Sequence, residues 1–266
     1  MVKNAGYDHV KLSGKAAVIT GGARGIGKAS ALALAKEGAD IAFADLLESE
    51  AAETVSEIEA LGRRAVFTQA DVGKRADCER LFADAIGTLG RVDILLNNAA
   101  ASVRKLLIDL EVEDVEKTWG PTLWSVFHCS QLAARQMIAQ GDGGSIISIS
   151  SVQGVRPYAL STAYNGAKAA VIHMSRTWAV ELAQHGIRVN TIEPGWIDTP
   201  GERKHADEDE IRTLGAKLPF KRLGKPEEIA GLVVFLASDE DAGYVTGSSL
   251  RMDGGFILPR MTKLEY

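Results

Sequence analysis

The sequence predicts an α/β protein whose core is a doubly wound parallel β-sheet of about seven strands, with helices on both faces. Three observations lead to this prediction. Short apolar runs alternate with longer segments of helical period along the chain. The segments between the runs are long enough to connect parallel strands. No Pro-, Gly- or Ser-rich linker divides the 266 residues, so we expect one domain over residues 1–266.

Seven runs rich in β-branched and other apolar residues are expected to form the strands. In chain order they are Ala16–Thr20, Ile41–Ala44, Ala65–Gln69, Val92–Leu96, Ser145–Ile149, Arg188–Ile192 and Ser248–Met252. The helical patterns between them include Gly25–Glu37, Glu50–Leu61, Lys74–Thr88 and Val112–Gln140. Right-handed crossovers should place these helices on both faces of the sheet. Such sheets bind ligands at the carboxyl ends of their strands, near the point where the strand order reverses.

The composition is that of an ordinary globular protein and argues against several functional classes. Hydrophobic residues make up 46% and charged residues 24% of the chain. The formal net charge of -5, without a Lys/Arg cluster, argues against a nucleic-acid partner. No stretch approaches about 18 continuous apolar residues, so no membrane span is expected. The acidic run Asp207–Glu210 is expected to begin a solvated helix.

Cysteine and histidine placement gives no support for a disulfide framework or a metal site. Cys78 and Cys129 lie in helical patterns without metal-ligand spacing. The five histidines also lack such spacing. Residues Met1–Lys15 are polar and show no signal-peptide pattern. We therefore expect a cytoplasmic protein in a reducing compartment, without a metal.

A glycine-rich turn follows the first expected strand and opens a helix. It reads Thr20-Gly21-Gly22-Ala23-Arg24-Gly25-Ile26-Gly27, with GxxxGxG spacing. The three spaced glycines permit a tight turn and close backbone approach, which would place free N–H groups and the positive end of the helix dipole against a pyrophosphate. The alternative is a purely structural turn. In this strand–turn–helix setting the dinucleotide interpretation is favoured.

Asp45, at the end of the second strand, carries the prediction of the cofactor. An acidic side chain about twenty residues beyond the turn would accept hydrogen bonds from the adenosine ribose and repel a 2′-phosphate. Arg24 would instead pair with that phosphate, but Leu46 leaves no basic residue just after the strand. We expect NAD, with NADP less favoured. Asp71 and Val72 are expected to meet the adenine, although Asp71 could also be a helix cap.

Polar residues end the fourth and fifth expected strands. The fourth ends in Asn97-Asn98-Ala99-Ala100, where Asn98 is expected to brace neighbouring strands through its side chain. The fifth runs into Ser151, which lies at a carboxyl end, where ligands bind. In most proteins a serine there is only a turn residue.

Tyr164 and Lys168 lie four residues apart at the start of a strongly helical segment. This spacing places both on one helix face, so the lysine ammonium can lie beside the phenol. A neighbouring cation favours the phenolate and lowers the pKa of a tyrosine, as a general acid or base requires. Ser151 precedes Tyr164 by thirteen residues. Alone, the pair would usually be an ordinary feature of a helix surface.

The joint order of these motifs, followed by Pro194-Gly195 and Thr199, resembles the short-chain dehydrogenase/reductase family from about Lys11 to Gly255. The resemblance implies a single Rossmann-like domain and hydride transfer between a nicotinamide cofactor and a carbonyl or alcohol. It implies Tyr164 as the acid/base and Ser151 as the hydroxyl that holds the substrate oxygen. Lys168 would hold the nicotinamide ribose and lower the pKa of Tyr164.

The same resemblance implies a set of cofactor-binding positions, with Thr199 and the backbone near Ile197 holding the carboxamide. These positions are Gly21, Arg24, Gly25, Ile26, Gly27, Asp45, Asp71, Val72, Asn98, Ala99, Tyr164, Lys168, Pro194, Gly195, Ile197 and Thr199.

Two positions depart from the family pattern. Members usually carry an asparagine in the long central helix, where it holds a water that relays protons through the lysine. Thr122 occupies that position, so we count it as a catalytic candidate in an altered relay. Pro121 beside it removes a backbone N–H and should kink the helix. Ala100 replaces the usual glycine, without a clear chemical consequence.

The segment from Trp196 to Leu218 is the expected substrate lid, with hinges at its glycine and proline positions. The alternative is a surface helix that only connects two layers. Candidate substrate residues are Ser151, Gln153, Arg156, Tyr158, Trp196 and His205. The tail Phe256–Tyr266 could close a neighbour's pocket. By resemblance we expect a homotetramer, packed through the helices Val112–Gln140 and Thr162–Gln184.

We therefore expect an oxidoreductase that transfers a hydride between NAD and a secondary alcohol or ketone, with a sugar or polyol favoured over a steroid. A second hypothesis is an NADPH-dependent carbonyl or 3-oxoacyl reductase that uses Arg24 for the phosphate. A third is a nucleotide-binding sensor or scaffold without turnover, because Thr122 and Pro121 alter the relay. The partner is then a small molecule, with no nucleic acid and no membrane.

Overall fold

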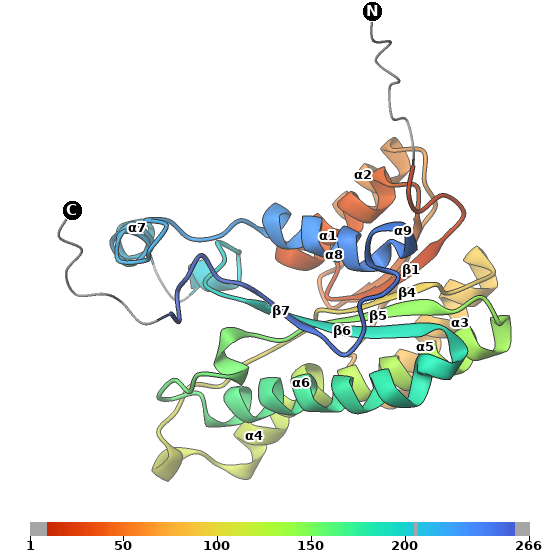
Figure 1. Cartoon of the computed structure of the whole chain (residues 1–266). Coiled ribbons are helices and arrows are strands. Elements are labelled where there is room, and N and C mark those ends of the chain that lie inside the picture. Colours follow the sequence, from red (N-terminus) through yellow and green to blue (C-terminus); the bar gives the residue numbers. More distant parts are fainter. Residues whose placement is uncertain (1–9, 205–206, 259–266) are drawn as a thin grey trace, which may run out of the picture.

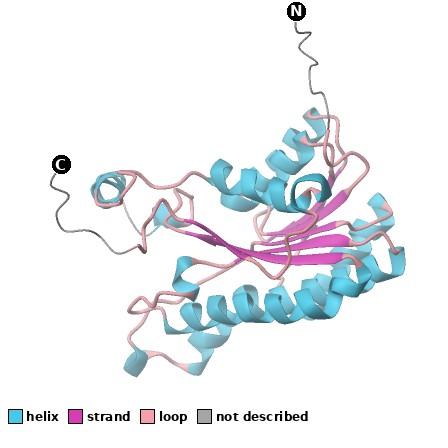
Figure 2. Cartoon of the chain, in the orientation of Figure 1, coloured by secondary structure: helices cyan, strands magenta, loops and turns pink. Residues whose placement is uncertain are grey.

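The computed structural model of the chain describes residues 10–204 and 207–258. Its centre is a seven-stranded parallel sheet with the order β3-β2-β1-β4-β5-β6-β7 (Figures 1 and 2). The strands are β1 (Ala16–Thr20), β2 (Asp40–Asp45), β3 (Ala65–Gln69), β4 (Ile94–Asn97), β5 (Gly144–Ile149), β6 (Ile187–Pro194) and β7 (Ser249–Met252). The predicted doubly wound sheet is confirmed. The strand order reverses between β1 and β4, so ligands are expected at the carboxyl ends of these strands.

Helices cover both faces of the sheet (Figure 1). The α-helices are α1 (Gly25–Lys36), α2 (Glu48–Ala60), α3 (Arg75–Leu89), α4 (Val112–Trp119), α5 (Ser125–Gln140), α6 (Thr162–Leu182), α7 (Glu208–Ala216), α8 (Pro226–Ala237) and α9 (Asp239–Ala242). Short 3-10 helices are η1 (Leu107–Asp109), η3 (Val152–Gly154), η4 (Ala183–His185) and η5 (Glu202–Lys204). Helices α1, α2 and α8 lie on one face, and α3, α5 and α6 lie on the other.

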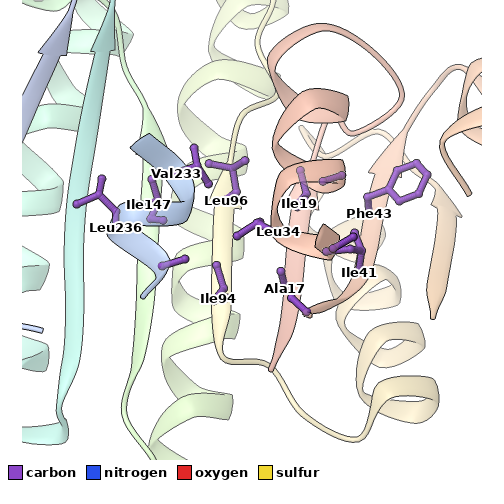
Figure 3. Packing of buried hydrophobic residues seen from close by; sticks show 14 of the residues in the cluster. Ala17, Ile19, Leu34, Ile41, Phe43, Ile94, Leu96, Ile147, Val233 and Leu236 are labelled. Carbon is purple, nitrogen blue, oxygen red and sulfur yellow. The ribbon is translucent and has the colours of Figure 1, made fainter. Parts of the chain in front are cut away.

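Strand residues alternate between two hydrophobic cores, one on each face. In β1, Ala17 and Ile19 pack toward α1 and α8, whereas Ala16 and Val18 pack toward α3 and α5. Figure 3 shows Ile19 on the first face beside Leu34 of α1. Because both faces are covered, β1 and β2 are almost entirely apolar rather than alternating in polarity. Each fully buried Leu or Ile contributes about 1.5–3 kcal/mol of hydrophobic free energy, and the two cores hold the strand ends in fixed positions.

The helix predicted over 112–140 is interrupted at the expected place. A π-helical turn, η2 (Gly120–Trp124), separates α4 from α5. Pro121 has no N–H to donate to the preceding turn, so the α-helical ladder cannot run through this position. The Trp119 indole N–H donates to the Ala163 carbonyl oxygen over 2.9 Å. This contact fixes the break against the first turn of α6.

The predicted acidic helix start is also confirmed. Asp207 caps α7, its carboxylate accepting from the Glu210 N–H over 2.8 Å, and the Glu210 carboxylate accepts from the Asp207 N–H in return. This capping box satisfies two backbone donors at the helix end. Within the described part of the chain, no helix has the length and apolar character needed to cross a membrane.

Candidate active site

The glycine-rich turn joins β1 to α1 and leaves no room for side chains at its base. A Cβ atom at Gly27 would lie 1.9 Å from the Gly21 carbonyl oxygen and 2.6 Å from the Asn98 amide nitrogen. Gly25 has a φ of 56°, a region that favours glycine. Arg24 and Ile26 are half-buried beside it. The turn therefore offers a bare backbone cradle at the N-terminus of a helix, which fits the pyrophosphate of a dinucleotide.

Asn98 braces this turn from the end of β4, as predicted. Its side-chain amide donates to the carbonyl oxygens of Thr20 and Gly21 over 3.1 and 2.9 Å. The Thr20 hydroxyl in turn accepts from the N–H groups of Asn98 and Ala99 over 3.0 and 3.1 Å. The carboxyl ends of β1 and β4 are thus locked together at the point where the strand order reverses.

Asp45 ends β2 beside the turn. Its carboxylate accepts hydrogen bonds from the N–H groups of Ala23, Leu46 and Leu47 over 3.0, 2.8 and 3.2 Å. These donors hold the negative charge at the edge of the cradle. Leu46 is 63% exposed and carries no charge. Among the described residues, the Arg24 guanidinium has no ion-pair partner.

The contact of Asp71 and Val72 with an adenine stays a prediction. In the structure the Asp71 N–H donates to the Asp77 carboxylate over 2.8 Å. Asp77 lies in the first turn of α3, so its side chain reaches back to the preceding backbone. The Asp71 carboxylate accepts from the Gly73 N–H over 3.1 Å, a local turn contact before α3, whose N-cap residue is Lys74. Val72, between them, is buried.

The turn after β6 lies against the glycine-rich turn. A Cβ atom at Gly25 would lie 3.5 Å from the Thr199 side chain. A Cβ atom at Gly195 would lie 2.7 Å from Asp253, so only glycine fits at the position that follows Pro194. Ile197 is buried and forms a parallel bridge with Gly224. The structure therefore brings these predicted cofactor positions to one end of the sheet.

Ser151, Tyr164 and Lys168 meet at the carboxyl end of β5. Ser151 follows the strand, and its Oγ accepts from the Gln153 N–H over 3.1 Å. Tyr164 lies in the first turn of α6, and the Lys168 Nζ is 5.5 Å from the centroid of its ring. Lys168 is 1% exposed, and its Nζ donates to the Ile149 carbonyl oxygen over 2.7 Å. The predicted triad of side chains is therefore gathered in one place.

The expected lowering of the Tyr164 pKa does not occur in the chain without a bound cofactor. Burial raises the pKa of Tyr164 to about 12, assisted by the negative charge of Glu202, whereas Ser151 and Arg104 act in the opposite direction. Burial lowers the pKa of Lys168 from 10.5 to about 7. A lysine that loses its charge through desolvation gives a neighbouring phenol little electrostatic help. Desolvation, which residue spacing does not reveal, outweighs the attraction between the two groups.

The Thr122 hydroxyl is engaged with the loop after β4. It donates to the Ala101 carbonyl oxygen over 2.9 Å and accepts from the Ala101 N–H over 3.0 Å. Thr122 is fully buried. A hydroxyl has a single proton to donate, so this side chain keeps only acceptor capacity for a further partner.

Among the candidate substrate residues, Gln153 lies beside Ser151, to whose Oγ it donates its N–H. Tyr158 packs against Phe256 with ring centroids 6.0 Å apart, and Trp196 packs in the same small cluster as Phe256. The start of the C-terminal segment thus lies against its own chain's aromatic residues. Arg156 is exposed, and the Gln153 side-chain oxygen is buried without a hydrogen-bond partner. His205 lies outside the described residues.

Two charged residues near Tyr164 were missed by the sequence reasoning. Glu202 lies in η5 of the expected lid, and Arg104 lies in the loop between β4 and α4. Both act on the pKa of Tyr164 through their charges. Neither belongs to a motif, and each is about forty or more residues away along the chain. Only the tertiary fold brings them to the phenol.

The two cysteines are free and buried. No group of histidine, cysteine or acidic residues within the described ranges is arranged to hold a metal ion.

Comparisons with known proteins agree with this fold. A family model described as enoyl-(acyl carrier protein) reductase matches residues 21–257. L-rhamnose 1-dehydrogenase (NAD(P)(+)) of Sphingomonas sp. (strain SKA58) is 39% identical, covering 93% of this chain and 98% of the relative. The 3-oxoacyl-[acyl-carrier-protein] reductase FabG of Thermotoga maritima is 38% identical, covering 94% and 100%.

A solved structure of a short-chain type dehydrogenase/reductase from Mycobacterium marinum superimposes with a TM-score of 0.88 at 37% identity, covering 95% of this chain and 99% of that one. The family model and these relatives together indicate a nicotinamide-dependent oxidoreductase. The chain belongs to the short-chain dehydrogenase/reductase family. It is an NAD(P)-dependent enzyme that acts on CH–OH groups.

Proposed function

We propose that the chain is an NAD-dependent dehydrogenase of secondary alcohols in which Tyr164 is the acid/base. The observation that carries this proposal is the cluster of Ser151, Tyr164 and Lys168 at the carboxyl end of β5. A bound nicotinamide would supply or accept the hydride. Tyr164 would take the proton from the substrate hydroxyl during oxidation and return it during reduction. The Ser151 hydroxyl would donate to the same substrate oxygen and stabilise charge on it.

Lys168 and Thr122 have supporting parts in this proposal. The Lys168 Nζ uses one donor on Ile149 and can offer others to a ribose. Thr122 holds the loop after β4 through Ala101, so we assign it a positioning role rather than a step in a proton relay.

Tyr164→Phe tests the catalytic assignment, with Tyr244→Phe, a change at a fully exposed tyrosine, as the matched control. Loss of a general acid/base costs about 10²–10⁴-fold in rate. We expect NADH formation, followed by absorbance with a panel of secondary alcohols, to fall by that amount in the first variant and by much less in the second. Undiminished hydride transfer in Tyr164→Phe would remove the phenol from the mechanism.

The preference for NAD rests on Asp45. Its carboxylate is fixed at the edge of the cradle by three backbone N–H groups, where it would accept from ribose hydroxyls and repel a 2′-phosphate. Calorimetry should give tighter binding of NAD than of NADP to the wild type. Asp45→Ala should relax this discrimination, whereas Asp71→Ala should preserve it. Tighter binding of NADP by the wild type would contradict the assignment.

An NADPH-dependent carbonyl or 3-oxoacyl reductase is the second candidate. Its support is the Arg24 guanidinium, half-buried in the turn and without an ion-pair partner among the described residues. A guanidinium there would pair with a 2′-phosphate. Turnover numbers with NADH and NADPH on a ketone and on a 3-oxoacyl thioester separate the two candidates.

For the substrate we propose a sugar or polyol. The polar candidates around Ser151 and the L-rhamnose dehydrogenase relative support this class, whereas the acyl-carrier reductase relative supports the second candidate. The segment 196–218 would act as a lid, since α7 reaches the rest of the chain through a small cluster that includes Ile211, Leu218 and Leu223. A screen of sugars, polyols and ketones by NADH absorbance tests the class.

We also propose a cytoplasmic homotetramer. Apolar side chains remain exposed on the outer faces of η2, α5 and α6, where the resemblance expects neighbouring subunits. These are Trp124 (50%), Phe127 (37%), Ile138 (40%) and Val180 (80%). Two free cysteines are compatible with a reducing compartment. Light scattering at micromolar concentration tests the assembly, and a monomer would contradict it. Cell fractionation tests the location.

A further inference from the structure

Glu202 is a charged group beside the proposed acid/base that the chemistry described above does not use. It begins η5, which lies within the lid segment. Its hydrogen-bond partner Trp196 follows the end of β6. That end lies beside the end of β5 that precedes Ser151, where the Ser150 N–H donates to the Ile192 carbonyl oxygen over 2.8 Å. The negative charge of Glu202 also acts on the Tyr164 phenol. Glu202 is half-buried rather than solvated. A partly desolvated carboxylate is costly unless hydrogen-bond donors satisfy it, so its partners matter.

The position of Glu202 is fixed by its neighbours. Its carboxylate accepts from the Trp196 indole N–H over 3.2 Å, and its own N–H donates to the Thr199 hydroxyl over 3.3 Å. The next residue, Arg203, binds Asp198 through two hydrogen bonds of 2.7 and 2.8 Å and also pairs with Glu208 at the start of α7. The short helix is therefore tied to the turn after β6 and to the lid helix.

The Glu202 carboxylate has unused acceptor capacity. Among the side chains that the structure describes, which do not include that of Lys204, Trp196 is the hydrogen-bond donor found for this carboxylate. An ionised carboxylate has about four lone-pair sites. On the Ser151 side of the cluster, the Gln153 side-chain oxygen is also buried without a partner. Both groups are acceptors, so the complementary ligand is one that brings additional hydrogen-bond donors.

Aromatic rings complete the surroundings. Trp196 and Phe256 pack in one cluster, and Phe256 also packs against Tyr158. Aromatic faces suit the C–H surface of a ring or chain, while carboxylate and amide oxygens suit its hydroxyl groups. A substrate with an additional carboxylate or phosphate close to the reacting carbon would instead face the negative charge of Glu202.

We propose that the Glu202 carboxylate, held by Trp196 on the lid beside Tyr164, accepts a hydrogen bond from a second substrate hydroxyl next to the carbon that is oxidised. It thereby selects vicinal diols over simple alcohols and disfavours substrates with an anionic group at that place. This inference rests on the proposed dehydrogenase function and names a specificity-determining residue for it.

The test compares wild type, Glu202→Gln and the control Asp209→Asn, which alters an exposed acidic residue of the same lid. The substrates are 1,2-cyclohexanediol, cyclohexanol and 2-hydroxycyclohexanecarboxylate. In Glu202→Gln we expect the ratio of kcat/KM for the diol to that for cyclohexanol to fall about tenfold to a hundredfold, as loss of a charge-assisted hydrogen bond predicts. In the same variant, kcat/KM for the hydroxycarboxylate should rise relative to kcat/KM for cyclohexanol. Asp209→Asn should keep the wild-type ratios.

Two further readouts separate this inference from a structural effect and from failure of the proposed function. The pH profile for cyclohexanol should move to lower pH in Glu202→Gln, because removal of a negative charge lowers the pKa of Tyr164. Calorimetry of the diol with the NADH complex needs no turnover. An unchanged diol-to-cyclohexanol ratio, equal diol binding by wild type and Glu202→Gln, or no diol binding by wild type would overturn the inference. Absence of hydride transfer from all three alcohols would instead overturn the proposed function.

Discussion

Lys168 is expected to destabilise the cofactor-free chain at neutral and acidic pH, and Lys168→Met should reveal this cost. The ammonium is buried at 1% exposure, and burial lowers the pKa of the side chain from 10.5 to about 7. Below pH 7 the folded chain must hold a charged lysine in a desolvated place. The unfolded chain holds the same charge in water.

The sign and the pH window follow from proton binding. Between pH 7 and 10.5 the unfolded chain binds the Lys168 proton more strongly than the folded chain, so stability rises with pH across this window. At about 1.4 kcal/mol per pKa unit, the penalty is about 5 kcal/mol at pH 6 and about 1–2 kcal/mol at pH 9.5. The difference between these two conditions is about 3 kcal/mol.

Methionine removes the charge but leaves the Ile149 carbonyl oxygen without its donor. An unsatisfied buried group costs about 1–3 kcal/mol at any pH. Lys168→Met should therefore be more stable than wild type by about 2–4 kcal/mol at pH 6 and close to equal or less stable at pH 9.5. The fixed hydrogen-bond cost cancels in the comparison between the two pH values.

Urea unfolding of the cofactor-free protein at both pH values measures this effect, at one protein concentration because assembly also shifts stability. The control is Lys36→Met, which changes an exposed lysine at the end of α1 and should respond little to pH. The reasoning would be refuted if the free energies of unfolding of Lys168→Met and wild type differed by the same amount, within about 1 kcal/mol, at both pH values.

Two other substitutions test the framework around the site. Gly27→Ala would place a Cβ atom 1.9 Å from the Gly21 carbonyl oxygen, so calorimetric affinity for NAD should fall at least about tenfold. Its control, Gly87→Ala, meets no atom within 4 Å on α3 and should stabilise the chain by about 0.5–1 kcal/mol in urea. Thr122→Val removes both hydrogen bonds to Ala101 and should lower the free energy of unfolding by about 1–3 kcal/mol. Thr122→Ser keeps the hydroxyl and should retain most of the wild-type stability. Equal stability of the two Thr122 variants would contradict this role.

The fold was largely predictable because its signals are local. The run Ala16–Thr20 has the same bounds as the observed β1, and the break at Pro121 follows from the missing N–H of proline. The Asn98 brace was predictable from a polar amide at a strand end. The order of the motifs also placed Ser151 and Tyr164 together. The strand that precedes Ser151 ends, and the helix that contains Tyr164 begins, at the same edge of the sheet.

The parts that could not be predicted depend on distant neighbours. The sequence does not show that the Asp77 carboxylate accepts from the Asp71 N–H. Spacing suggested a charged Lys168 beside Tyr164, but burial opposes that charge. Glu202 reaches the site because Trp196 and Thr199 fix η5. No periodicity in the sequence encodes those contacts.

The two pKa shifts of the active site have one cause and a common consequence. In the proposed mechanism, oxidation needs a Tyr164 that can release its proton to solvent and accept one from the substrate, and a charged Lys168 favours that phenolate. Burial in the chain alone favours the neutral form of both groups. Any bound group that gives the Lys168 Nζ further acceptors would restore its charge and so lower the pKa of Tyr164. Cofactor binding at the cradle and proton transfer by Tyr164 are therefore linked through Lys168. In a variant without an ionisable side chain at position 168, such as Lys168→Met, Tyr164 should stay protonated when substrate binds.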